Sequence, residues 1–155
     1  MSEVSESVLV EASLAEAWDL YFDPNRWTEW VDGFGSIATS EGYPAAGGTL
    51  RWISNPSGRG EVHERVLEHE PRGLHRIAFV DPQSEGELRT TFSIEGSGVR
   101  VSQALRYALR GGGIFGRISD LLFIRSQQRG SLQRSLGGLK SELEHGAGNP
   151  GTGAR

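Results

Sequence analysis

The stretch that decides the fold is Ser13-Leu-Ala-Glu-Ala-Trp-Asp-Leu-Tyr-Phe-Asp-Pro-Asn-Arg-Trp-Thr-Glu-Trp30. Ser13 is followed three residues later by Glu16, a capping-box pattern that predicts a short helix ending near Phe22. Pro24 cannot continue that helix, but it is well suited to the first turn of another one. The stretch therefore predicts two short helices in succession.

Alternating apolar and polar residues predict β-strands on both sides of this helical pair. Val4–Ala12 precedes the helices and carries valines on one face. After the helices, short β-rich runs are separated by turns that are too short for a parallel crossover, so neighbouring strands should be antiparallel. The six strands expected here are Ser36–Glu41, Thr49–Ser54, Gly60–His69, Leu74–Val80, Gly86–Ile94 and Val99–Ala108.

A long helix is predicted after the last strand, where the apolar spacing changes to steps of three and four. Its apolar side comprises Ile118, Leu122, Leu132, Leu136, Leu139 and Leu143, and the series passes through Arg125 and Arg129. Glycines at positions 130, 137 and 138 weaken the helix, which indicates that tertiary packing holds it and that another backbone approaches closely there.

The length and composition of the chain limit the kinds of site that it can contain. A chain of 155 residues suits one domain, here residues 1–144, and the glycine-rich segment 145–155 is expected to be a disordered tail. The absence of cysteine excludes disulfides, thiolate nucleophiles and sulfur-ligated metal sites. The acidic, polar N-terminus does not resemble a secretory signal, so we expect a cytoplasmic protein.

Several spaced segments also match one family in the right order. They are Ala12–Trp18, Asp23–Trp30, Gly48–Trp52, Arg65–Pro71 and Leu136–Leu143. Over about residues 4–144 the chain resembles the START-like (SRPBCC, Bet v 1-like) superfamily, in particular its polyketide cyclase/dehydrase and lipid-transport branch. The resemblance implies an α+β helix-grip fold, in which a seven-stranded curved antiparallel sheet wraps around the C-terminal helix and encloses a cavity.

The strand Gly60–His69 holds the main candidates for chemistry. His63 and Arg65 share one face of this strand, and Glu64 lies on the other. The resemblance to aromatase/cyclase members implies an arginine that points inward just before a valine, and Arg65 matches that position with His63 beside it. The alternative is an exposed Arg65 paired with a glutamate. In an enzyme, Arg65 would stabilise an enolate while His63 or Tyr107 moves protons.

Other residues are expected to form the cavity wall because they are aromatic or lie on the inward series of a strand or helix. The full set of expected ligand-binding residues is Trp27, Trp30, Phe34, Trp52, His63, Arg65, His75, Phe79, Phe92, Gln103, Tyr107, Phe115, Leu122, Arg125 and Arg129. His63 and His69 would lie roughly 20 Å apart on one strand. No metal site and no cofactor are therefore expected, although His69 and His75 flank a turn and could meet.

The charges are distributed unevenly. Between Arg100 and Lys140 there are eight basic residues and one acidic residue, although the whole chain has a formal charge of -4. Either this half packs beside the acidic half, or it faces an anionic ligand or lipid surface. The loop Gly111–Gly113, with Phe115 just after it, is expected to gate the cavity, and transient contact with an anionic membrane surface is a further expectation.

Three functions remain open at this point. The favoured one is binding or carriage of a small hydrophobic ligand, lipid- or polyketide-like, with an acidic or phenolic end. The second is a polyketide aromatase/cyclase-like enzyme, and the third is a protein-interaction or co-chaperone domain, which would have an exposed apolar patch and no enclosed cavity. No nucleic-acid partner is expected from an acidic chain, and the protein is expected to be a monomer or a homodimer.

Overall fold

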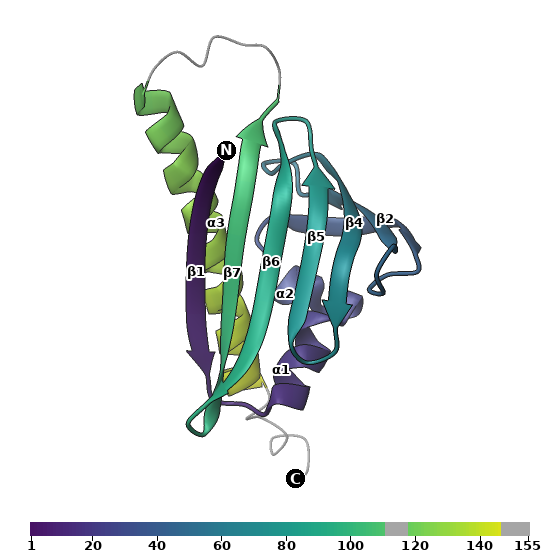
Figure 1. Cartoon of the computed structure of the whole chain (residues 1–155), viewed down its shortest axis with the longest axis vertical. Coiled ribbons are helices and arrows are strands. Elements are labelled where there is room, and N and C mark those ends of the chain that lie inside the picture. The colour runs from purple at the N-terminus through teal and green to yellow at the C-terminus, as the bar shows by residue number, and fades with distance from the viewer. Residues whose placement is uncertain (111–117, 147–155) are drawn as a thin grey trace.

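The computed structural model describes residues 1–110 and 118–146, in which a curved antiparallel sheet packs against one long helix (Figure 1). The strands are β1 (Ser2–Val10), β2 (Phe34–Glu41), β3 (Thr49–Ser54), β4 (Glu61–Glu70), β5 (Leu74–Val80), β6 (Ser84–Glu95) and β7 (Gly98–Leu109). The helical segments are α1 (Leu14–Tyr21), the 3-10 turn η1 (Pro24–Arg26), α2 (Trp27–Trp30), α3 (Ile118–Ser141) and the π turn η2 (Glu142–Gly146).

The seven strands are hydrogen-bonded in the order β1-β7-β6-β5-β4-β3-β2. Strands β2 to β7 follow one another as a meander, and β1 joins the sheet beside the last strand. The predicted α+β helix-grip architecture is confirmed, and β3 and β5 have the predicted boundaries. The capping pattern also forms, because Ser13 Oγ accepts a hydrogen bond of 3.1 Å from the Glu16 backbone N–H.

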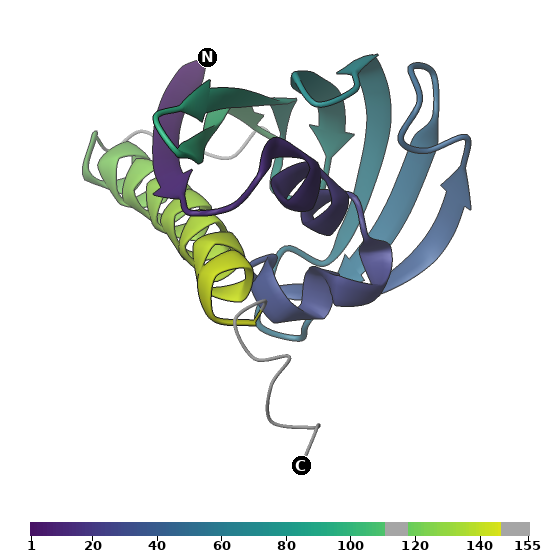
Figure 2. The same cartoon turned by 90° about the horizontal axis from the view of Figure 1, so that it is seen from below.

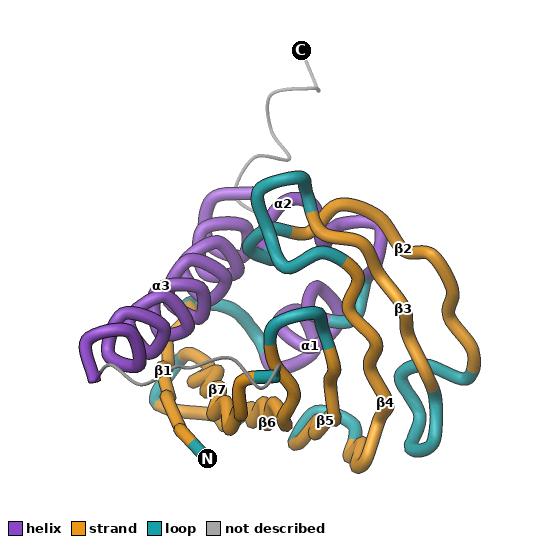
Figure 3. The backbone as a smooth tube through the Cα atoms, turned by 90° about the horizontal axis from the view of Figure 1, so that it is seen from above, coloured by secondary structure: helices purple, strands orange, loops and turns teal. Residues whose placement is uncertain are grey.

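The helices close the open side of the curved sheet. Figures 2 and 3 show α1 and α2 across the concave side and α3 running along β1. The C-terminal half of α3 and the following turn η2 provide a buried stripe that packs into the core, formed by Leu132, Leu136, Leu139 and Leu143. No helix among the described residues is both long and apolar enough to cross a membrane.

The predicted apolar series is wrong in the N-terminal half of α3. Leu122 is 61% exposed, and Arg125 and Arg129 are also exposed, with Arg129 Nε 3.6 Å from Glu6 Oε1. Steps of four back from Leu132 lead to positions 128 and 124, and these are the positions that turn toward the sheet. The three residues therefore do not line the cavity.

The predictions for Phe115, for the loop Gly111–Gly113 and for most of the tail fall outside the described residues.

The close backbone approach predicted at the glycines of α3 occurs at Gly138. A Cβ atom added there would lie 3.0 Å from the Trp30 carbonyl oxygen and 3.1 Å from the Trp30 Cα. At the preceding Gly137, a Cβ would meet nothing within 4 Å. Gly138 therefore lets α3 pack directly on the backbone of α2.

This difference predicts opposite effects of two neighbouring substitutions. Gly137→Ala should raise the free energy of unfolding by about 1 kcal/mol, because alanine favours a helix and the site has space. Gly138→Ala should lower it, because the added methyl group would lie only 3.0–3.1 Å from backbone atoms of Trp30, which cannot rotate away as a side chain can. Urea unfolding of the two variants checks this prediction, and an equal gain in both would show that α2 moves freely relative to α3.

Candidate ligand-binding cavity

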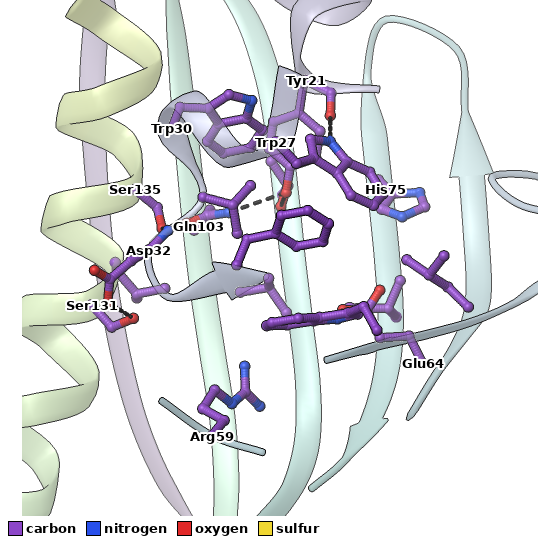
Figure 4. Close-up of a pocket in the computed structure, with 18 of the residues that line it drawn as sticks. Tyr21, Trp27, Trp30, Asp32, Arg59, Glu64, His75, Gln103, Ser131 and Ser135 are labelled. Atoms are coloured by element: carbon purple, nitrogen blue, oxygen red, sulfur yellow. Dashed lines mark hydrogen bonds between the residues drawn. The ribbon is translucent and has the colours of Figure 1, made fainter. Parts of the chain in front are cut away.

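A cavity of about 120 Å³ lies between the concave face of the sheet and the helices α1, α2 and α3 (Figure 4). A smaller cavity of about 50 Å³ adjoins it and shares Arg59, Glu64 and Leu88 with it. An apolar cavity of about 150 Å³ can hold one benzene ring. Taken together, the two adjoining cavities are therefore of a size for a ligand with about one ring and a short substituent.

Half of the predicted Trp, Phe and Tyr residues line this cavity. The structure brings together six residues of the predicted set: Trp27, Trp30, Phe34, Trp52, His75 and Gln103. Phe79 lines the smaller cavity. Phe92 is buried in the core, where its ring contacts those of Trp18 and Tyr21.

The expectation that His63 and Arg65 enter the cavity is wrong. On β4 the buried residues are Val62 and Val66, and Glu64 on the same face lines the cavity. His63 has 60% of its side chain exposed on the opposite face, where Nε2 lies 3.1 Å from Glu61 Oε1, and Arg65 is also exposed. The physical reason is that the two valines bury more apolar surface than the alternative face could.

Tyr107 does not reach the main cavity either. It is 3% exposed, but it borders a separate surface groove together with Met1 and Leu121. The three residues predicted to act in a cyclase mechanism are therefore not brought together.

The predicted set missed the charged and phenolic side chains that line the cavity: Tyr21, Asp32, Tyr43, Arg59 and Glu64. The alternation on β4 carries the signal for Glu64, because Val62 and Val66 on the same face are apolar. Arg59 and Tyr43 lie in connections between strands, where no periodicity indicates which way a side chain points.

Aromatic rings form adjoining walls of the cavity. The ring of Trp27 is nearly perpendicular to those of Phe34 and Tyr43, at 82° and 87°, with centroid distances of 5.6 and 5.8 Å. Phe34 in turn lies 5.6 Å from Trp52 at an angle of 38°. Edge-to-face packing of this kind stabilises rings in fixed positions, so the walls are preorganised.

A buried hydrogen-bond network forms the end of the cavity near α1. The Tyr21 hydroxyl lies 2.8 Å from Thr90 Oγ1 and accepts a hydrogen bond of 3.1 Å from Gln103 Nε2. Burial raises the pKa of Tyr21 to about 12, so its hydroxyl stays neutral. Three buried polar atoms on the wall have no hydrogen-bond partner among the described residues: Trp30 Nε1, His75 Nε2 and Gln103 Oε1.

The predicted meeting of His69 and His75 is observed. Their Nδ1 atoms are 3.0 Å apart, which requires one ring to donate a proton to the other. Burial, with the neighbouring His69, lowers the pKa of His75 to about 4, so this imidazole is neutral at pH 7. Among the described residues there is no group of three or more His, Asp or Glu side chains that could hold a metal ion.

The lowered pKa of His75 makes the stability of the fold depend on pH. Between about pH 6.5 and pH 4 the unfolded chain binds more protons at this residue than the folded chain does, so stability falls as the pH falls. Wild-type protein should lose about 2 kcal/mol through His75 on going from pH 7 to pH 5. The His75→Gln variant should lose that much less, as measured by urea unfolding at the two pH values.

The matched control is His63→Gln, because His63 is exposed on the outer face of the sheet. It should show the wild-type pH dependence. An unchanged pH dependence in His75→Gln would mean that His75 is protonated as easily in the folded protein as in the unfolded chain.

The comparisons with known proteins agree with this architecture. The model of the polyketide cyclase/dehydrase and lipid transport family matches residues 1–144, and the chain belongs to that family. No curated protein matches the sequence significantly.

Three solved structures illustrate the likeness of the fold. A protein of unknown function from Staphylococcus aureus is 9% identical, with a TM-score of 0.72 over 96% of each chain. The di-domain ARO/CYC BexL from the BE-7585A biosynthetic pathway is 17% identical, with a TM-score of 0.71 over 92% of this chain and 50% of its own. DynU16, from the dynemicin biosynthetic locus, is 19% identical, with a TM-score of 0.68 over 94% of this chain and 48% of its own. At these identities the likeness establishes the fold alone.

Proposed function

We propose that this protein binds a small, mainly apolar molecule that carries hydrogen-bonding groups in the cavity between the sheet and α1, α2 and α3. The family to which the chain belongs includes lipid transport, and the aromatic walls favour an apolar body. A ligand of about one ring and a short substituent fits the volume.

The observation that carries the proposal is the set of unpartnered polar atoms in residues that line the cavity beside its aromatic and aliphatic side chains. Trp30 Nε1 is a donor, Gln103 Oε1 is an acceptor, and His75 Nε2 is one or the other according to its tautomer. A buried polar atom without a partner costs about 1–3 kcal/mol. A ligand that supplies the missing partners recovers this free energy, which gives the cavity selectivity as well as affinity.

The structure also bears on the cyclase hypothesis and on the interaction-domain hypothesis. A cyclase that uses Arg65 has no support, because Arg65 and His63 lie on the outer face of β4. An acidic or phenolic end on the ligand was expected because Arg65 was predicted to face the cavity, so the exposed position of Arg65 removes that reason as well. An interaction domain would have an exposed apolar patch, and Leu121, Leu122 and Phe123 are exposed on α3, but the cavity between the sheet and the helices favours ligand binding.

Binding can be tested with small aromatic probes and a variant that fills the cavity. Toluene, phenol and indole should bind the wild-type protein saturably, as measured by calorimetry. Leu88 lines both cavities, so Leu88→Trp should weaken binding by at least about tenfold because the added ring occupies the space.

The control is Glu85→Trp, which adds the same ring on β6 at an exposed position. It should bind the probes as the wild type does. Failure of all three probes to bind the wild-type protein, or equal binding to both variants, would contradict the proposal.

A further inference from the structure

Three charged side chains border the cavity, and two of them are neutralised by partners outside its lining. Asp32 accepts hydrogen bonds of 3.0 and 3.2 Å from the guanidinium of Arg134. Arg59 lies 2.6 Å from Asp81 through Nη2. Each of these charges therefore has an opposite charge in direct contact.

The third charge, on Glu64, has no such partner. Its Oε1 atom accepts a hydrogen bond of 2.9 Å from Trp52 Nε1, which is a neutral donor. No Lys, Arg or His among the described residues lies within the 4.0 Å of an ion pair with Glu64. A carboxylate partly removed from water without a counter-ion in contact is unfavourable. Burial raises the pKa of Glu64, and the Trp52 hydrogen bond and the more distant charge of Arg59 offset only part of this shift.

The walls beside Glu64 also suit a cation. Trp52 donates directly to this carboxylate, and the rings of Phe34, Trp27 and Tyr43 continue from Trp52 in a chain of contacts of 5.6 to 5.8 Å. The faces of such rings attract ammonium groups, most strongly when the cation is desolvated. A carboxylate in a cavity lined by several aromatic rings is a combination that can recognise a protonated amine.

We infer that the ligand carries a protonated amine beside its apolar body, with Glu64 as the counter-ion and the neighbouring aromatic rings as the walls. This inference rests on the proposed binding function and specifies its ligand class. The amine would supply the ion-pair partner that Glu64 lacks and would lie in the space that Glu64 borders in both cavities.

Arg59 is the group that could oppose this selectivity, because it borders both cavities as well. Its guanidinium carbon lies 4.8 Å from the centre of the Phe79 ring and 5.9 Å from that of Trp52, and its nitrogens bind Asp81. The ion pair with Asp81 offsets the positive charge of Arg59 toward the cavity. Ligands that differ only in charge will show whether Glu64 or Arg59 has the larger effect on binding.

The test uses 2-phenylethylamine, 2-phenylethanol and phenylacetate, which share a ring and differ in charge. Calorimetry at pH 7 should give the tightest binding for the amine and the weakest for phenylacetate. Glu64→Gln should weaken binding of the amine by about tenfold or more, the range for loss of a charged hydrogen bond, and change binding of the neutral alcohol by no more than about twofold. Glu64→Asp, which keeps the charge, should retain the preference for the amine.

Glu61→Gln is the matched control, since Glu61 is exposed on the same strand and points away from the cavity. It should leave all three affinities unchanged. If 2-phenylethanol binds but the amine binds no better, or if phenylacetate binds best, the inference is overturned while the binding function stands. If none of the three compounds binds, both are overturned.

Discussion

The contact between α3 and the backbone of α2 holds the cavity together. Gly138 lets the two segments meet without an intervening side chain, and the ring of Trp30 is thereby fixed in the cavity wall. Just beyond α2, Asp32 takes hydrogen bonds from Ser131 and Arg134 of α3, while its own N–H donates to Ser135. Because α3 also buries its leucine stripe on β1, one helix joins the edge of the sheet to the aromatic wall.

The cavity lining combines two kinds of surface, one that is more stable without water and one that needs hydrogen-bond partners. Aromatic walls are more stable without water, whereas Glu64, Gln103 and His75 each retain hydrogen-bonding capacity that the protein does not use. Closer packing would leave these polar groups buried without partners, and wider opening would expose the rings. An amphipathic ligand of the kind proposed would satisfy both surfaces at once.

Sequence periodicity predicted the fold well and the site in part. The turns and the alternation of apolar residues located the strands, since both depend on neighbouring residues. The position of Glu64 could also have been predicted, because Val62 and Val66 mark its face as the buried one; the family resemblance pointed to Arg65 instead. Contacts such as that between Arg59 and Asp81 join loops far apart in the chain, and no local pattern encodes them.

Because β1 pairs with β7, the last strand of the sheet, it stays unpaired during most of the translation of the chain. Val10 pairs with Val99 and Ser2 with Tyr107, so the first strand has no partner until roughly 90–105 further residues have been translated. At about 5–20 residues per second, this strand waits roughly 5–20 s with both edges free. Its outer face carries Glu3, Ser5 and Ser7, and such polar residues disfavour pairing with other nascent chains during the delay.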